Sequence, residues 1–268
     1  LKRIGIIGTG SYLPTKILSN KDLEKTVDTS DEWIRERTGI SHRRIAGEKA
    51  ASSDLGAVAA ERAIQSARLT AEDIDLIIVA SASPNKIFPS TACIIQNKIG
   101  AKKAAAFDLQ AGCTGFVYGL TTAAQFILAG LYKNILVIGT EVLSKLTDWE
   151  DRNTCILFGD GAGAVVLSEV QNGGILASIL GSDGSGAELL EVPAGGSREP
   201  AGDDTIKNRR HYIKMSGNEV FKFAVKILDE STRRVLQKAN LSLEDVDFII
   251  PHQANIRIID AALKRLKY

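Results

Sequence analysis

Short apolar runs alternate along the chain with longer segments in which apolar residues recur every third or fourth position. The runs predict buried strands and the periodic segments predict helices, because a strand buried on both faces is apolar throughout, whereas a helix buries one face. The predicted strands lie at 104–109, 134–138, 162–168 and 246–250. The predicted helices lie at 92–99, 116–129 and 255–266, the last with Ile256, Ile259, Leu263 and Leu266 on one face. This order of elements predicts an α/β fold.

An internal repeat indicates that the chain contains two similar halves. Residues 63–80 and 235–252 align at an offset of 172 with eight of eighteen pairs identical, and both predict a helix end, an acidic loop and a strand. One repeat at this distance indicates a duplicated half, and we assign the halves to 1–172 and 173–268. The second half has a single helix after residue 252, so we expect it to be incomplete in this chain. Chance similarity between common helix–loop–strand patterns is the alternative.

Cys113 lies where a predicted strand turns into a predicted helix, among the small residues of Gln110-Ala111-Gly112-Cys113-Thr114-Gly115. A helix N-terminus favours a thiolate over a thiol, and glycines leave room for a substrate, so this layout is typical of an activated nucleophile. A free cysteine is as often a small buried side chain. We expect that role for Cys93 and Cys155, which lie in apolar stretches.

A nucleophilic cysteine needs an acid–base partner, and the chain has three histidines. His42 and His211 lie in basic, polar segments and are expected to be solvated. His252 instead follows the predicted strand 246–250 and Pro251, and precedes a helix. Because ligands and catalytic groups gather at the carboxyl ends of strands in α/β folds, Cys113 and His252 are candidates for one site.

Composition narrows the class of protein. A hydrophobic content of 44% supports a sizeable core, and a net charge of +1 favours neither nucleic acid nor membrane as a partner. No apolar run reaches membrane-spanning length, the three cysteines fit a reducing compartment, and no spacing indicates a metal site. These features predict a cytoplasmic enzyme. The glycines around Gly8 and Gly161 lack the pattern of a dinucleotide site, and we interpret both groups as tight turns.

Several segments, in this order along nearly the whole chain, resemble the β-ketoacyl-acyl-carrier-protein synthase III family. Two carry most of the resemblance: Ala111-Gly112-Cys113-Thr114-Gly115-Phe116 and Pro251-His252-Gln253-Ala254-Asn255. The others lie at 8–14, 28–34, 37–40, 158–164 and 217–221. The resemblance implies a thiolase fold, with duplicated βαβαβαββ halves in five layers (αβαβα), and a homodimer.

The resemblance also implies a reaction. Cys113 would take an acyl group from acyl-CoA, and His252, with an asparagine, would assist the decarboxylation of malonyl-acyl carrier protein. The product is a 3-oxoacyl-acyl carrier protein that starts fatty-acid synthesis, and no cofactor is implied because the CoA thioester is a substrate. The family's asparagine and its glycine-rich loop would fall beyond Tyr268. The sequence does not indicate which acyl group serves as the primer.

Binding residues are carried over from the same resemblance. Trp33 and Arg152 would sandwich the adenine of CoA, and Phe88 would bound the acyl pocket of a partner subunit. The other expected contacts to CoA or its pantetheine arm are Thr29, Arg37, Phe158, Asn218, Phe221, Ala254, Asn255 and Arg257. The basic side chains expected to dock the acidic carrier protein are Lys222, Arg257, Lys264 and Arg265.

Two other functions fit the same residues. A Cys-His thioester hydrolase would release free acid and CoA without any malonyl group. A truncated, non-catalytic paralogue would bind CoA without turning it over.

Overall fold

The computed structural model describes residues 2–268, which form two compact units. The first unit comprises residues 2–16, Arg44–Leu143 and Gly159–Leu180. The second comprises Ile17–Arg43, Ser144–Phe158 and Gly181–Tyr268. Each unit is described by itself.

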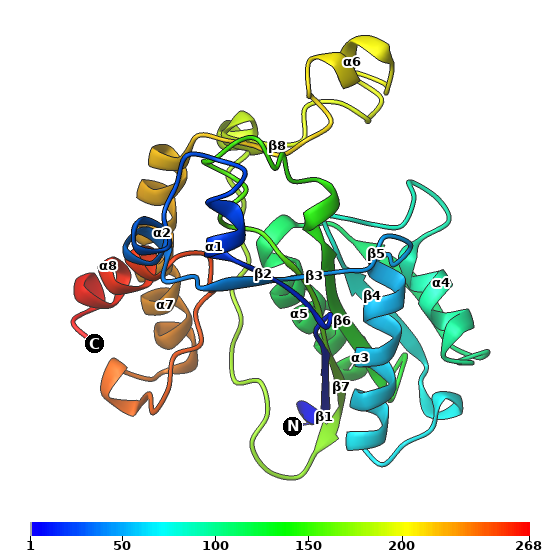
Figure 1. The fold of residues 1–268 in the computed structure, drawn as a ribbon. Coiled ribbons are helices and arrows are strands. Elements are labelled where there is room, and N and C mark those ends of the chain that lie inside the picture. Colours follow the sequence, from blue (N-terminus) through cyan, green and yellow to red (C-terminus); the bar gives the residue numbers. More distant parts are fainter. Residues whose placement is uncertain (1) are drawn as a thin grey trace. The chain divides into compact units, whose positions relative to one another are not determined.

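The first unit is built on a five-stranded mixed sheet with the strand order β1-β7-β6-β4-β5 (Figure 1). β4 runs parallel to β5 and β6, whereas β7 runs antiparallel to β6 and β1. The strands are β1 (Arg3–Tyr12), β4 (Leu76–Ala80), β5 (Ala105–Leu109), β6 (Ile135–Val142) and β7 (Asp160–Val170). Three predicted strands are thereby confirmed as β5, β6 and β7. β5 forms an edge of the sheet and is only half-buried, because no strand of residues 2–268 covers its outer side.

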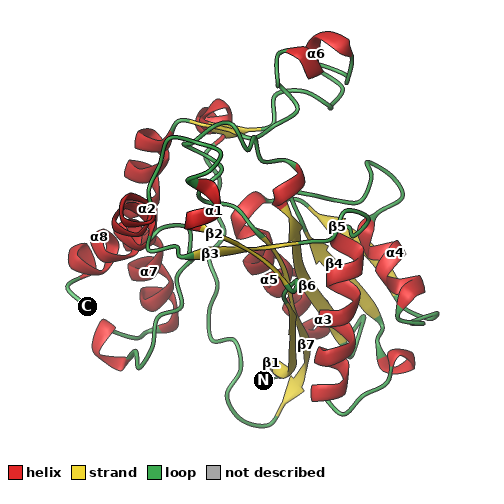
Figure 2. Ribbon diagram, in the orientation of Figure 1, coloured by secondary structure: helices red, strands yellow, loops and turns green. Residues whose placement is uncertain are grey.

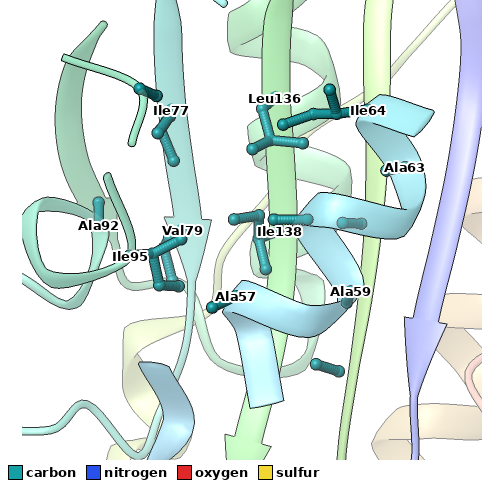
Figure 3. Close-up of a cluster of buried hydrophobic side chains, with 14 of the residues drawn as sticks. Ala57, Ala59, Ala63, Ile64, Ile77, Val79, Ala92, Ile95, Leu136 and Ile138 are labelled. Atoms are coloured by element: carbon teal, nitrogen blue, oxygen red, sulfur yellow. The ribbon is translucent and has the colours of Figure 1, made fainter. Parts of the chain in front are cut away.

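Helices pack on both faces of this sheet (Figure 2). On one face, α3 (Ser52–Ser66) and α4 (Thr91–Lys98) cover side chains such as Val79 and Ile138 (Figure 3). On the other face, α5 (Gly115–Leu128) covers the alternate positions of the same strands, such as Ile78 and Val137. The strands are apolar throughout because each successive residue is buried under a helix. The predicted helices 92–99 and 116–129 correspond to α4 and α5.

The glycines of β1 allow α3 to lie unusually close to the sheet. A Cβ atom on Gly8 would come within 2.4 Å of the backbone oxygen of Ala63, and one on Gly10 within 2.2 Å of that of Ala59. Gly161 likewise lies inside β7. The interpretation of these glycines as tight turns is therefore wrong, because they lie in strands, and those of β1 provide space for a helix backbone.

Replacing Gly10 by alanine should destabilise the protein by about 2–3 kcal/mol, since neither backbone can retreat from the added methyl group without disturbing the core. Gly163→Ala is the matched control, because a Cβ atom at this strand position meets no atom within 4 Å. Thermal unfolding measures both variants. Equal melting temperatures for G10A and G163A would contradict the packing argument.

The second unit is mostly helical. Its helices are α1 (Asn20–Leu23), α2 (Asp31–Thr38), α6 (Asp203–Lys207), α7 (Gly217–Ala239) and α8 (Ile256–Leu266). Two small sheets pair β2 (Lys16–Ser19) with β3 (His42–Ile45) and β8 (Leu190–Glu191) with β9 (Lys214–Met215). α7 and α8 lie side by side (Figure 1) and are joined through buried Asp229, whose carboxylate accepts hydrogen bonds from Arg233 and Arg265 at 2.8 Å each.

The internal repeat appears as the same turn built twice. After α3 and after α7, Arg68 and Asn240 adopt left-handed φ angles of 57° and 55°, and these positions are 172 apart. The next turn is capped in both copies by an aspartate: Asp73 accepts from the backbone N–H of Thr70 at 2.8 Å, and Asp245 from that of Ser242 at 2.8 Å. The predicted similarity of these segments is therefore confirmed at the level of single hydrogen bonds.

The two copies diverge after this turn. The first continues into β4, but residues 246–250 form no strand, contrary to the prediction, and Phe248 and Ile250 are 78% and 79% exposed. β4 pairs with a neighbour on each side, whereas no part of the chain that the structure describes pairs with 246–250. A strand is stabilised by its ladder partners, so an apolar sequence alone does not make this segment extended.

The last predicted helix is confirmed as α8, capped by Asn255, whose side chain accepts from the N–H of Arg257 at 2.8 Å. Its buried face differs from the prediction. Ile258, Ala262 and Leu266 are buried, whereas Ile256 is 41% exposed. The reason is that α8 packs against both α7 and α2, so the face that these helices bury is not the face that carries the most apolar side chains.

Candidate active site

Cys113 lies in the short turn η2 (Gly112–Thr114), directly between β5 and α5. The strand ends at the carboxyl edge of the sheet, and small residues bring the following helix close to it: a Cβ atom on Gly115 would lie 3.1 Å from that of Ala80 on β4. The side chain of Cys113 is exposed. The predicted position at a strand-to-helix turn is confirmed, and the residue is exposed although the surrounding protein partly desolvates its sulfur.

The electrostatic surroundings of Cys113 favour the thiol. The protein around the sulfur desolvates it and raises the pKa of Cys113 above its ordinary value, and the negative charge of Glu141 acts in the same direction. The backbone hydrogen bond at Cys113 opposes this shift but is the smallest of the three effects. Desolvation and the like charge therefore act against the preference for a thiolate that is expected from the helix N-terminus.

The other two cysteines differ from Cys113. Cys155 is fully buried, and desolvation raises the pKa of its thiol to about 11, which makes it unreactive. Cys93 was expected to be buried but is exposed. The cause is its place on α4 beside the edge strand β5, where its sulfur lies 3.7 Å from the carbonyl oxygen of Ala106.

His252 lies in the loop between η5 (Leu243–Asp245) and α8, in the second unit, whereas Cys113 belongs to the first. The His252 side chain is exposed, yet the surrounding protein partly desolvates it and lowers the pKa of its imidazole, which favours the neutral ring. His42 is exposed, as predicted. His211 is only partly exposed, contrary to the prediction, because its ring packs on that of Tyr212 at a centroid distance of 4.0 Å.

A cation–aromatic cluster forms within the second unit. The guanidinium of Arg152 lies 4.6 Å from the centre of the Trp33 ring, and that of Arg37 lies 5.3 Å from it. Trp33 is placed by α2, whose N-cap Ser30 accepts a hydrogen bond from the Trp33 N–H at 3.1 Å. Nearby in sequence, the hydroxyl of Thr29 is buried and has no hydrogen-bond partner among the described residues. The structure thus brings together three residues that the sequence analysis assigned to CoA.

The remaining predicted binding residues lie on or next to the helices of the second unit. Arg257, at the start of α8, lies 6.0 Å from the ring of Phe221 on α7. Asn255 is committed through its side chain to capping α8. Asn218 is exposed, and Ala254 and Phe158 are partly exposed.

Two of the four expected docking residues have internal partners. Arg265 bonds the carboxylate of Asp229 at 2.8 Å, and Arg257 lies against Phe221. Lys222 and Lys264 are exposed. In the first unit, Phe88 is 82% exposed in the loop between β4 and α4.

Glu141 is the polar residue near the site that the sequence analysis missed. It lies at the end of β6, where its carboxylate accepts hydrogen bonds from the backbone N–H of Ala82 at 2.8 Å and from the hydroxyl of Ser83. A signal was present in the sequence, because an acidic residue lies three positions after the end of the apolar run 134–138. No cluster of potential metal ligands occurs among residues 2–268, and none of the helices described there is long and apolar enough to cross a membrane.

Comparison with known proteins connects this arrangement to a family. The family model for 3-oxoacyl-[acyl-carrier-protein (ACP)] synthase III matches residues 107–184, and the model for its C-terminal part matches residues 236–268. β-Ketoacyl-[acyl-carrier-protein] synthase III of Caldanaerobacter subterraneus is 60% identical over 264 residues, which cover 98% of this chain and 80% of the relative. That of Clostridioides difficile is 54% identical over 265 residues, covering 99% and 81%.

Solved structures give the same result. 3-Oxoacyl-[acyl-carrier-protein] synthase III from Aquifex aeolicus superposes with a TM-score of 0.89 at 48% identity, covering 100% of this chain and 81% of the other. The enzyme from Pseudomonas aeruginosa superposes with a TM-score of 0.90 at 40% identity, covering 99% and 80%.

The exposed cysteine at the carboxyl edge of the sheet, together with this likeness, defines a condensing acyltransferase with the thiolase fold. The identity to relatives over nearly the whole chain narrows the class further. The chain belongs to the β-ketoacyl-[acyl-carrier-protein] synthase III family and is an enzyme of fatty-acid biosynthesis.

Proposed function

We propose that Cys113 is the nucleophile of the condensation. The supporting observation is its exposed sulfur in the turn between β5 and α5. In the first half-reaction, the sulfur attacks the carbonyl carbon of an acyl-CoA, the bond from that carbon to the CoA sulfur breaks, and CoA leaves as a thiol with the proton of Cys113. CoA thus enters as part of a substrate, and no bound cofactor is needed.

The second half-reaction uses malonyl-acyl carrier protein. Loss of CO₂ leaves the electron pair of the broken C–C bond on the carbon next to the thioester. This carbon attacks the acyl group on Cys113, and the sulfur leaves as a thiolate that takes up a proton. We assign to His252 the donation of an N–H hydrogen bond to the thioester oxygen, on which negative charge develops. Its lowered pKa suits this role, because a neutral imidazole retains one N–H.

The cluster around Trp33 is our proposed site for the CoA nucleotide. An aromatic ring and a guanidinium plane both stack on an adenine, so the base would insert between Trp33 and Arg152, which requires Arg152 to move off the ring. The unpartnered hydroxyl of Thr29 and the guanidinium of Arg37 would bond polar groups of the nucleotide. Arg257 would be a further polar contact to the nucleotide, and the proposed wall of the pantetheine tunnel comprises Phe158, Asn218, Phe221, Ala254 and Asn255.

We further propose a cytoplasmic homodimer built from chains with two similar halves, 1–172 and 173–268. β5 is an edge strand with small residues at Ala105 and Ala106, and an exposed edge is suited to pairing with a second copy. The exposed ring of Phe88 would then reach the acyl pocket of that copy.

Product analysis tests the function. The purified protein is incubated with radiolabelled acetyl-CoA, with and without malonyl-acyl carrier protein, and its products are separated. Condensation gives labelled 3-oxoacyl-acyl carrier protein only when the malonyl group is present. Free labelled acid in both incubations would indicate the thioester hydrolase, and unchanged acetyl-CoA in both would indicate a protein that only binds CoA.

Reversing two charges tests the proposed docking surface of Lys222, Arg257, Lys264 and Arg265. The double variant R257E/K264E should raise the KM for malonyl-acyl carrier protein by roughly fivefold, because charge attraction steers an acidic partner, and leave acylation by a small acyl thioester nearly unchanged. The KM of the unmodified protein should also rise with salt. Lys49→Glu, at an exposed position of the first unit, is the control. Equal loss of both half-reactions would assign these residues to folding.

A further inference from the structure

The carboxyl edge of the sheet in the first unit carries a connected polar network that the proposed condensation does not use. Besides donating to Glu141, the Ser83 hydroxyl accepts from the backbone N–H of Val142 at 2.8 Å. Ser52, at the start of α3, donates through its hydroxyl to the carbonyl oxygen of Ser83. The network therefore ties the end of β6, the turn after β4 and the start of α3 into one assembly.

This assembly borders the turn that holds Cys113. Ala80, the last residue of β4, pairs in register with Gly139 of β6 and with Leu109 of β5, and it also lies against Gly115. Glu141 is two residues beyond Gly139, and Cys113 is four residues beyond Leu109. The carboxylate and the sulfur thus belong to the same edge of three neighbouring strands.

We propose that Glu141 is a positioning residue for the nucleophile: its carboxylate fixes the turn after β4 that borders Cys113, and it places a negative charge that disfavours a thiolate at the same edge of the sheet. This inference rests on the proposed role of Cys113 and extends it. A thiol is protected from oxidation and alkylation relative to a thiolate, so this charge would limit damage to an exposed sulfur.

The acidic groups nearest to this edge other than Glu141 are engaged elsewhere. Asp108 on β5 accepts from the backbone N–H groups of Thr91 and Ala92 at 2.7 Å, at the start of α4. Asp54 on α3 pairs with Lys98 on α4 at 2.9 Å. α5 carries no acidic or basic side chain, and its titratable group is Tyr118. In the loop after β4, Lys86 is exposed.

Glu141 is charged in the pH range in which a thiol titrates. Desolvation raises the pKa of Glu141 above its ordinary value, and the hydrogen bonds from Ser83 and Ala82 oppose this rise without cancelling it. An ordinary glutamate titrates about four pH units below a cysteine, so the carboxyl group is ionised when Cys113 begins to lose its proton. Its charge then opposes the formation of a second negative charge nearby, in agreement with the raised pKa of Cys113.

The experiment measures the alkylation rate of Cys113 by iodoacetamide against pH, with the modified peptide quantified by mass spectrometry. Glu141→Gln removes the charge and keeps the shape, and the Ser83 hydroxyl can accept from the new amide. The midpoint of the rate profile should fall by about one pH unit. Glu141→Asp keeps the charge and should leave the midpoint in place. Glu169→Gln, an exposed position on β7 that pairs with Lys2, is the matched control and should also leave it in place.

Ser83→Ala tests the hydrogen bonds that fix the turn after β4 separately from the charge of Glu141. It also serves if E141Q does not fold. It removes a hydrogen-bond donor to Glu141 and the acceptor of the Val142 N–H, so the Val142 amide should exchange with solvent faster, whereas the Cys113 midpoint should not fall. An unchanged midpoint in E141Q, or a fall in S83A or E169Q as large as that in E141Q, would overturn the proposal. Alkylation is measured without turnover, so failure of Cys113 as the catalytic nucleophile would show in acyl transfer and not in this profile.

Discussion

Replacing Cys113 by alanine should reduce acyl transfer from acyl-CoA by roughly 10⁴-fold or more, the scale on which loss of a covalent nucleophile acts. No second thiol can substitute for it. Cys155 is buried with a thiol pKa of about 11, and Cys93 lies on α4 rather than in the turn after β5. The measurement is the amount of labelled acyl group bound to the protein after incubation with acyl-CoA.

Cys93→Ala is the matched control for this experiment. It removes an exposed cysteine of the same unit and should leave acylation at the unmodified level. A C113A protein that still carries a thioester-linked acyl group, with an unchanged melting temperature, would show that the nucleophile is another residue.

The second large effect is expected at His252. Replacement by alanine should slow decarboxylation of malonyl-acyl carrier protein by at least about 10²-fold, because the charge on the thioester oxygen loses a hydrogen-bond donor. Acylation should fall too, since the pKa of Cys113 is raised and its thiol needs help to lose the proton. The two defects differ in their pH dependence. Raising the pH restores the thiolate and hence acylation, but it does not restore the missing donor.

The pH dependence of the unmodified protein provides a further check. Because the pKa of His252 is lowered, its ring stays neutral to a more acidic pH than a free imidazole. Acylation that relies on His252 to accept the Cys113 proton should be lost only below that range, whereas decarboxylation should persist there because the protonated ring keeps its N–H donors. His42→Ala, at an exposed histidine, should change neither half-reaction. If high pH rescues both steps of H252A equally, His252 acts only as a base for Cys113.

Local sequence patterns predicted the parts of the structure that are determined by interactions between residues close together in the sequence. The turn around Cys113, the helix after it and the repeated acidic loops follow from glycine, from helical periodicity and from acidic residues that bond their own neighbours, although the capping roles of Asp73 and Asp245 were not foreseen. The family resemblance added the cluster at Trp33 and Arg152, whose members are far apart in sequence and meet only in the folded unit.

The parts that local patterns could not predict depend on what lies across from each residue. Residues 246–250 have the composition of a strand, but a strand exists only where another one pairs with it. Gly8 and Gly10 resembled turn glycines, because nothing in β1 indicates how closely the backbone of α3 approaches. The charge of Glu141 acts on a cysteine 28 positions earlier, through a register of three strands that emerges only from the sheet.

The position of β5 at the edge of the sheet connects the proposed self-association of the protein with the reactivity of Cys113. The strand that would pair with a second copy in the proposed homodimer is the same strand that leads into the Cys113 turn, with three residues between Leu109 and Cys113. Pairing along this edge would stiffen the strand up to its last residue, and dissociation would release it. The reactivity of Cys113 would then depend on protein concentration, and dilution would lower it by dissociating the two copies.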